Sequence, residues 1–496
     1  MNSAYSERPP APARGFDRGW LALPALAACV AVGTAVALSP TAALATAAAL
    51  TVLTVFFVRP AWTLAVVLVF LVVQDPLEVL FERNFELGYL VKRADIPLVL
   101  LIGTLTLGFA SVRRVLAGRR GLLVAVLATL ATLAASTFVA RPLWRPAALD
   151  LALIWKSIVL VPIGILFDRA SADAEALFRR TMMALTAVCL TALPLLLSPG
   201  LLMSYLGDSS RPDYRIGMIS AQGFFLNAGT FSWFAGATFC VALAGYLARL
   251  RGPYLWYTLS AGAMVVLSWR RKSILAIVFV LLISVIVTGR ASQRARALAL
   301  VGIAAVVALT VLAPYLVQLT EITVDTYGSA NPMQTARHAL YSASWTIASE
   351  HMPLGTGLGT FGSYASRYFY SELYFKYGIA NIYGLSPQHP YFINDAYWPM
   401  LLAEGGVLCP LAFFAALLIA MRSAWRAIAE ARGGARHDLA LHLAVLFLLA
   451  ASALESVASA MYSSTLPAAL VFVPLGMHLS RTWSARARSG DVLPPR

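Results

Sequence analysis

The chain has 496 residues, of which 59% are hydrophobic and only 12% are charged, and its mean hydropathy is +0.75. A soluble domain carries about 25% charged residues, so this composition excludes an ordinary soluble protein and predicts a polytopic membrane protein. The formal net charge of +15 raises nucleic-acid binding as an alternative, but in a membrane protein a basic excess more often reports orientation.

Long apolar runs recur along the whole chain and predict an all-α fold with about 12–14 transmembrane helices. The predicted spans are 20–38, 40–58, 60–75, 95–112, 121–140, 149–167, 181–198, 224–247, 253–269, 273–289, 297–318, 396–421, 439–459 and 464–480. The predicted regions are a cytoplasmic tail (1–19), an N-terminal transmembrane bundle (20–318), a large periplasmic loop (319–395), C-terminal helices (396–480) and a basic cytoplasmic tail (481–496).

The cations of the chain fall mainly on one side of these spans. If the N-terminus is cytoplasmic, the inside segments hold 24 Lys and Arg against 8 Asp and Glu, whereas the outside segments hold 13 against 15. The positive-inside rule therefore predicts that both termini are cytoplasmic. This bias accounts for most of the net charge, so we expect no nucleic-acid partner.

The stretch "RPDYRIGMISAQGFFLNAG" at 211–229 precedes a predicted span. Its Arg215 is a candidate for binding an anion. The alternative is a structural ion pair with Asp213 or Asp208, and the sequence alone does not choose between the two.

A basic turn, Arg270, Arg271 and Lys272, is predicted to face outward, on the side that otherwise avoids cations. The structural alternative is snorkelling of the long side chains at the membrane surface. The functional interpretation is binding of a phosphate or diphosphate, since arginine offers a fork of donors that matches phosphate oxygens.

The long outside loop contains a predicted amphipathic helix on the bilayer surface. Asn331 and Pro332 fit its N-terminus, and it should end before Pro353. Its apolar positions are Met333, Leu340, Ala343 and Ile347. Arg337 lies on the same helix.

The glycines of "HMPLGTGLGTFGSY" at 351–364 follow that helix. No strand precedes them and no Lys-Ser or Lys-Thr follows, which excludes a nucleotide-binding loop. We expect a tight turn that packs closely against a span.

Polar groups cluster at the mouth of the span that follows the loop. His389, Asn394 and Asp395 stand at its entrance, and Glu404 lies inside it. An intramembrane carboxylate is a functional candidate by default, although Glu404 could instead cap a helix or pair with a cation such as Arg215. Two further charges, Lys156 and Glu455, lie within spans and could pair with each other or line a cavity.

Three of these stretches together resemble the O-antigen polymerase and O-antigen ligase superfamily, over roughly residues 205–420. They are "RIGMISAQGFFLNAGTFSWF", "LSWRRKSILAIVFVLL", and "ARHALYSASWTIASEHMPLGTGLGTFGSY" followed by "HPYFINDAYWPMLLAEGGVLCPLAFF". In the family's ligases a His-Asn pair stands at the last motif. Counted back from Glu404, that position is nearer Asn394 and Asp395 than His389, which favours a polymerase.

The resemblance implies a GT-C-like fold, an undecaprenyl-diphosphate-linked glycan as donor, and neither metal nor other cofactor. It implies that Arg215 and either Arg270 or Arg271 hold the diphosphate. We take Arg215, Arg270 and Arg271 as the candidates and add Lys272 and Arg337 as weaker ones. His389, Asp395 and Glu404 are the candidates for the base that activates the acceptor hydroxyl, and attack opposite the leaving group would invert the anomeric configuration.

The expected protein is thus a polymerase of O-antigen, capsule or exopolysaccharide in the bacterial inner membrane. The alternative within the family is a ligase that transfers glycan to lipid A core, completing lipopolysaccharide, or to a protein. A lipid-linked oligosaccharide flippase is the rival from another class, but no repeat symmetry of the kind found in transporters is visible. Expected partners are the bilayer, the lipid-linked glycan, and a chain-length regulator and flippase of the same pathway.

Overall fold

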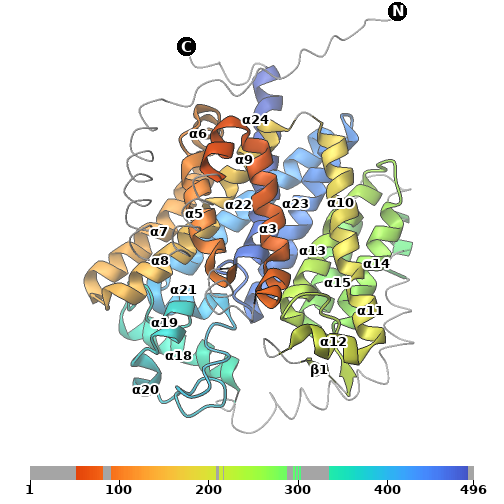
Figure 1. The fold of residues 1–496 in the computed structure, drawn as a ribbon. Coiled ribbons are helices and arrows are strands. Elements are labelled where there is room, and N and C mark those ends of the chain that lie inside the picture. Colours follow the sequence, from red (N-terminus) through yellow and green to blue (C-terminus); the bar gives the residue numbers. More distant parts are fainter. Residues whose placement is uncertain are drawn as a thin grey trace, which may run out of the picture. The chain divides into compact units, whose positions relative to one another are not determined.

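The computed structural model describes residues 52–81, 91–171, 173–207, 212–215, 217–287, 294–295, 298–299, 301–302 and 335–489. The regular structure of these residues is almost entirely helical, and the strands among them are the two-residue β1 (Tyr214–Arg215) and β2 (Met218–Ile219) (Figure 1). The helical segments among them that are long and apolar enough to cross a membrane are seven: Pro60–Leu80, Arg120–Ala140, Trp144–Ala170, Glu175–Leu197, Ala228–Leu247, Leu408–Ala431 and Arg436–Ala458. The prediction of an all-α polytopic membrane protein is confirmed.

The chain divides into two compact units. Unit 1 comprises residues 1–119, 158–181 and 472–496. Its helices are α3 (Pro60–Leu80), α5 (Asp95–Thr106), α6 (Ala110–Ala117) and α9 (Leu160–Ala170), with parts of α10 (Ala174–Leu190) and α24 (Thr465–Ser489). Helix α9 packs against α3, α5 and α6, and its Gly164 faces α24 so closely that a Cβ would lie 2.1 Å from the carbonyl oxygen of Val473.

Unit 2 comprises residues 120–157 and 182–471. Its longer helices are α7 (Arg120–Ala140), α8 (Trp144–Ile158), α13 (Ala228–Leu247), α14 (Tyr254–Leu267), α15 (Arg271–Val287), α22 (Leu408–Ala431) and α23 (Arg436–Glu455). Shorter elements are α11 (Ala192–Leu197), α12 (Pro199–Leu206), α18 (Ala336–Glu350), α19 (Tyr364–Tyr368), α20 (Leu373–Lys376), α21 (Tyr397–Gly405) and the 3₁₀ turn η4 (Ser456–Ala458). Helices α13 and α23 form the centre of the unit, and α23 packs against α13, α15 and α22.

Some predicted spans are divided in the structure: 95–112 comprises α5 and the start of α6, and 396–421 is divided as well. The run 396–421 is two helices, α21 and α22, separated at Gly406, which has a φ of 73°. A Cβ at Gly406 would lie 2.4 Å from the carbonyl oxygen of Pro353, so the chain turns where only glycine fits. Hydropathy does not register such a break. The predicted spans 20–38 and 297–318, and most of 40–58, lie outside the described residues.

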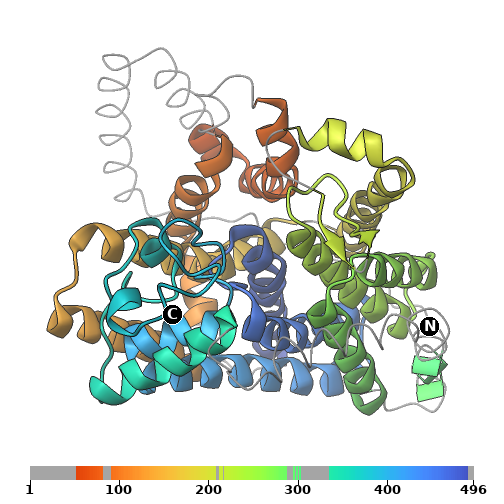
Figure 2. The same ribbon diagram turned by 90° about the horizontal axis from the view of Figure 1, so that it is seen from below.

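Helix α18 ends before Pro353, as predicted. Leu340, Ala343 and Ile347 pack with Phe361 and Tyr374 in one cluster, and the helix contacts α21, whereas Trp345 on the same helix is 65% exposed. The helix therefore supports the loop that follows, and its location on the bilayer surface stays a prediction. Figure 2 shows α18 beside this loop, which is drawn in teal. The predicted start of the helix, Asn331 and Pro332, lies outside the described residues.

Candidate functional site

Two short segments of unit 2 place Arg215 and Arg270 beside each other. The hairpin of β1 and β2 pairs Arg215 with Met218, and Gly217 supplies the positive φ that its turn requires. After the hairpin, the N–H of Ala221 donates to the carbonyl of Leu267 at 2.9 Å, which ties the hairpin to the end of α14. The chain then passes through Trp269, also at positive φ, and Arg270 emerges facing the hairpin.

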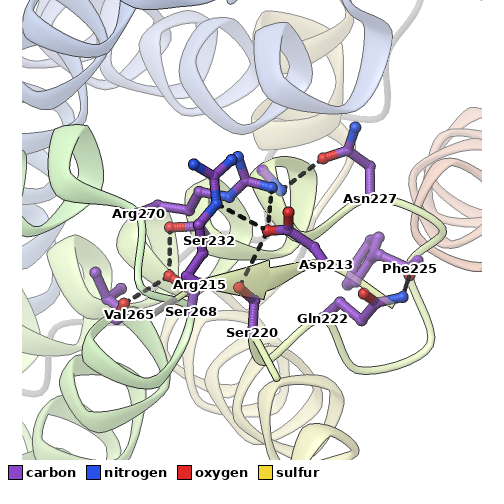
Figure 3. A network of polar contacts seen from close by, with 11 residues as sticks. Asp213, Arg215, Ser220, Gln222, Phe225, Asn227, Ser232, Val265, Ser268 and Arg270 are labelled. Carbon is purple, nitrogen blue, oxygen red and sulfur yellow. Dashed lines mark hydrogen bonds and ion pairs between the residues drawn. The ribbon is translucent and has the colours of Figure 1, made fainter. Parts of the chain in front are cut away.

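Asp213 joins the two arginines (Figure 3). Its Oδ2 atom accepts from Arg270 Nη2 at 2.7 Å and from Arg215 Nε at 3.4 Å. The hydroxyl of Ser220 donates to the same oxygen at 3.0 Å. A single carboxylate oxygen thus holds two guanidinium groups together. The ion pair between Arg215 and Asp213 that the sequence suggested is present, and Arg270 shares it.

The arginine pair extends to the mouth of α21. Burial lowers the pKa of the Arg270 guanidinium from its ordinary value, the Asp213 carboxylate opposes that shift, and the charges of Arg215, Asp395 and Arg337 also act on it. Arginine remains protonated in proteins despite such shifts. Arg337 of α18 is itself bound to Asp395, with Nη2 at 2.5 Å from Oδ2. Five charged groups from four segments therefore form one cluster, which we call the arginine–aspartate cluster.

Lys272 has different partners. Its Nζ lies 3.2 Å from Oε2 of Glu455 and 3.3 Å from the carbonyl oxygen of Ala458, and the hydroxyl of Ser273 donates to the other oxygen of Glu455. Glu455 is fully buried. Glu455 is thus paired with Lys272 of the basic turn. Arg271 is half-buried at the start of α15.

The glycine-containing segment 354–363 forms a tightly bonded loop, as predicted. The N–H groups of residues 355–363 all donate to acceptors in unit 2. Taken in chain order, the acceptors are the side chain of Ser136, the carbonyls of Ala403 and Glu404, and the side chains of Thr137, Asp150, Glu404 (twice), Tyr374 and Ser366. Gly357, Gly359 and Gly362 have positive φ, and a Cβ on Gly359 would lie 2.5 Å from the backbone of Pro146. A loop packed among membrane helices needs such complete bonding, because no water reaches its backbone.

Glu404 anchors this loop. Its Oε1 atom accepts from the N–H of Thr360 at 2.9 Å and of Phe361 at 3.0 Å, and the residue is fully buried. The buried carboxyl of Asp150 interacts with Glu404 and accepts from the N–H of Gly359 at 3.3 Å. Glu404 therefore has a structural task, and no contact joins it to Arg215.

His389 and Asp395 occupy different surroundings. His389 is exposed, its ring stacks on Tyr391, and its Nδ1 lies 3.1 Å from the Tyr391 hydroxyl. Asp395 belongs to the arginine–aspartate cluster. Asn394, its neighbour, accepts from Arg367 Nη1 at 3.3 Å. Of the three candidate bases, the structure brings only Asp395 to the predicted arginines.

Two residues of the site were not predicted in their observed roles. Asp213 was considered only as a structural partner of Arg215, and Asp150 was not singled out at all. Asp150 could have been found by the rule that flags carboxylates in apolar spans, since it lies at the start of the predicted span 149–167.

The arginine–aspartate cluster can bind a multivalent anion. Guanidinium groups held close together match the oxygens of a phosphate or diphosphate, and fixed cations stabilise charge that develops on a leaving group. Among the described residues, no group of three or more His, Cys, Asp and Glu side chains could hold a metal ion.

The helical architecture defines a polytopic membrane protein, and the arginine–aspartate cluster is its candidate site for an anion. Residues 254–384 match the family model described as O-antigen ligase, which supports the resemblance to the O-antigen ligase and polymerase superfamily. The resemblance seen in the sequence is confirmed. The matched segment contains Arg270, Arg337 and the glycine loop, whereas Arg215, Asp395 and Glu404 lie outside it. No curated protein matches the chain.

Proposed function

We propose that the protein is a glycosyltransferase that polymerises lipid-diphosphate-linked repeat units on the periplasmic face of the bacterial inner membrane. The family domain supports a function of the O-antigen ligase and polymerase type, whose members are glycosyltransferase-like enzymes. The observation that carries the finer proposal is the convergence of Arg215 and Arg270 on one oxygen of Asp213, beside Arg337 and Asp395.

In this proposal Arg215 and Arg270 hold the diphosphate of an undecaprenyl-linked donor. A hydroxyl of the acceptor glycan attacks the anomeric carbon, a new C–O bond forms, and the bond from that carbon to the diphosphate oxygen breaks. Asp395 takes the hydroxyl proton, and the undecaprenyl diphosphate leaves with the electron pair of the broken bond. The arginines stabilise the charge that grows on the leaving oxygen.

A ligase is the second candidate, because the description of the matching family is O-antigen ligase. Both activities use the same donor chemistry and differ in the acceptor. Counted back from Glu404, Asn394 and Asp395 stand where the ligases carry their His-Asn pair, which favours the polymerase.

The test is complementation of a strain that lacks the gene. The plasmids encode wild type, Arg215→Ala, Arg270→Ala and, as a matched control, Arg251→Ala, which removes an exposed arginine from the turn between α13 and α14. Surface and lipid-linked glycans are separated on gels at matched protein levels. We expect wild type and Arg251→Ala to restore long chains, and both site variants to leave single repeat units.

Other outcomes have defined meanings. Long chains that remain on undecaprenyl diphosphate in the deletion strain would identify a ligase. Repeat units trapped in the cytoplasmic leaflet would identify a flippase. Normal glycan in both arginine variants would refute the proposed diphosphate site.

A further inference from the structure

A second group of arginines lies in unit 1, at the C-terminal end of α9, and the proposed transfer reaction does not use it. Helix α6 and the turn after it, the end of α9 and the last turns of α24 meet there (Figure 1). A Cβ on Gly118 would lie 2.1 Å from the ring of Trp483, and a Cβ on Gly476 would lie 2.2 Å from the carbonyl oxygen of Val161. The three segments are therefore in direct contact, and their side chains have fixed positions.

The charges at this point do not balance. Arg169, at the end of α9, is half-buried, and the charged groups that act on it are Asp168, Arg114 and Arg481. Asp168 is already bound by Arg481, with Nε at 2.6 Å from Oδ1. Two further arginines, Arg114 and Arg481, thus act on Arg169, and the carboxylate that opposes them is already bound by Arg481.

The hydrogen bonds of Arg169 do not use all the donors of its guanidinium group. Its Nη2 donates to the hydroxyl of Ser484 at 3.4 Å, a long bond to a neutral acceptor. Its Nε is buried and has no hydrogen-bond acceptor among the described residues. A partly buried cation without sufficient counter-charge is costly, so the site favours an added anion.

Two simpler explanations account for only part of this arrangement. The dipole of α9 favours a cation at its C-terminus, by about 0.3–1 kcal/mol. The positive-inside rule explains why arginines occur at this end of the helices. Neither explains why Arg114 and Arg481, which come from two other segments, lie near the half-buried guanidinium group of Arg169.

We propose that Arg114, Arg169 and Arg481, which we call the α9 cluster, bind the phosphate of an anionic phospholipid headgroup. The apolar run of α9 ends at Phe167, directly before Asp168 and Arg169, so the cluster lies where a membrane helix meets the headgroup layer. Basic pockets between membrane helices bind anionic headgroups on the cytoplasmic side, and the positive-inside count predicts that side here. Guanidinium forks fit the phosphate oxygens.

The test uses the purified full chain in nanodiscs of phosphatidylcholine with or without phosphatidylglycerol. Arg169→Gln and Arg114→Gln are compared with Arg180→Gln, which removes the same charge from an exposed position on α10. Thermal unfolding and native mass spectrometry measure stabilisation and bound lipid. We expect phosphatidylglycerol to stabilise wild type and Arg180→Gln, and its affinity to fall about tenfold in each cluster variant, as for the loss of one charge-assisted hydrogen bond.

Two results would overturn the proposal. One is that Arg169→Gln and Arg114→Gln retain phosphatidylglycerol as wild type does. The other is that inorganic phosphate, added at the same concentration to the phosphatidylcholine sample, stabilises the protein equally, because the site would then take a free anion and no lipid. If Arg169→Gln does not fold, Arg114→Gln decides the question, since Arg114 is exposed on α6.

Discussion

The role of Glu404 can be tested by comparing Glu404→Gln with Glu404→Ala. The glutamine keeps the oxygen that accepts from Thr360 and Phe361, and removes only the ionisable group. The alanine leaves both buried N–H groups without an acceptor, at about 1–3 kcal/mol each, and adds a cavity of a further kcal/mol or more. We therefore expect Glu404→Gln to fold and to polymerise glycan within about threefold of wild type, a change in rate worth less than about 1 kcal/mol. Glu404→Ala should lose roughly 3 kcal/mol or more of stability.

The two quantities are measured separately. Unfolding of the purified chains in detergent reports stability, and the length distribution of glycan in the complemented strain, normalised to folded protein, reports activity. The reasoning is refuted if Glu404→Gln is as stable as wild type and makes no polymer, because the carboxylate would then be required for chemistry. It also fails if Glu404→Ala is fully stable, since the loop would not depend on this anchor.

Asp395→Asn should lower the rate of transfer in an in vitro assay by about 10²–10⁴-fold, as for loss of a general base, whereas His389→Ala should keep the rate within about threefold of wild type. If His389→Ala instead causes the larger loss, His389 is the base. Lys272→Met should destabilise the chain by about 3–5 kcal/mol, because it leaves Glu455 charged and buried, and adding Glu455→Gln should restore most of that stability. Unfolding of the single and double variants measures both effects, and a double variant as unstable as Lys272→Met would contradict the pairing. Gly359→Ala should be poorly folded because the residue has a φ of 74° and its Cβ would clash with the backbone of α8; normal yield and thermal stability would show that the loop can shift.

The helical fold was predictable because hydropathy is a local property of the chain. Helices such as α13 and α23 are long apolar runs, and a span needs little more than that. The break between α21 and α22 was not predictable in this way, because it depends on how closely the backbone of residue 353 approaches Gly406. That approach joins positions more than fifty residues apart in the sequence.

The candidate site was predictable in its residue types and not in its pairings. An outward basic turn and a polar span mouth could be located from charge distribution alone. Which carboxylate faces which cation depends on tertiary contacts: Lys272 meets Glu455 at a separation of 183 positions, and Arg270 meets Asp213 at a separation of 57. The apolar face of α18 shows the same limit, since periodicity reveals an apolar stripe but not whether lipid or protein covers it.

The balance of charge in the arginine–aspartate cluster fits a site that must release its product. Three arginines and two aspartates leave one net positive charge before any donor binds. In the proposed reaction the negative charge on the diphosphate increases as the anomeric bond breaks, so the arginines gain attraction for it in the transition state, which is what accelerates a reaction. Three uncompensated arginines would hold the released undecaprenyl diphosphate more tightly as well. The carboxylate of Asp213, which takes no proton in the proposed reaction, tempers that attraction, and inhibition of the transfer by added undecaprenyl diphosphate measures how far it does so.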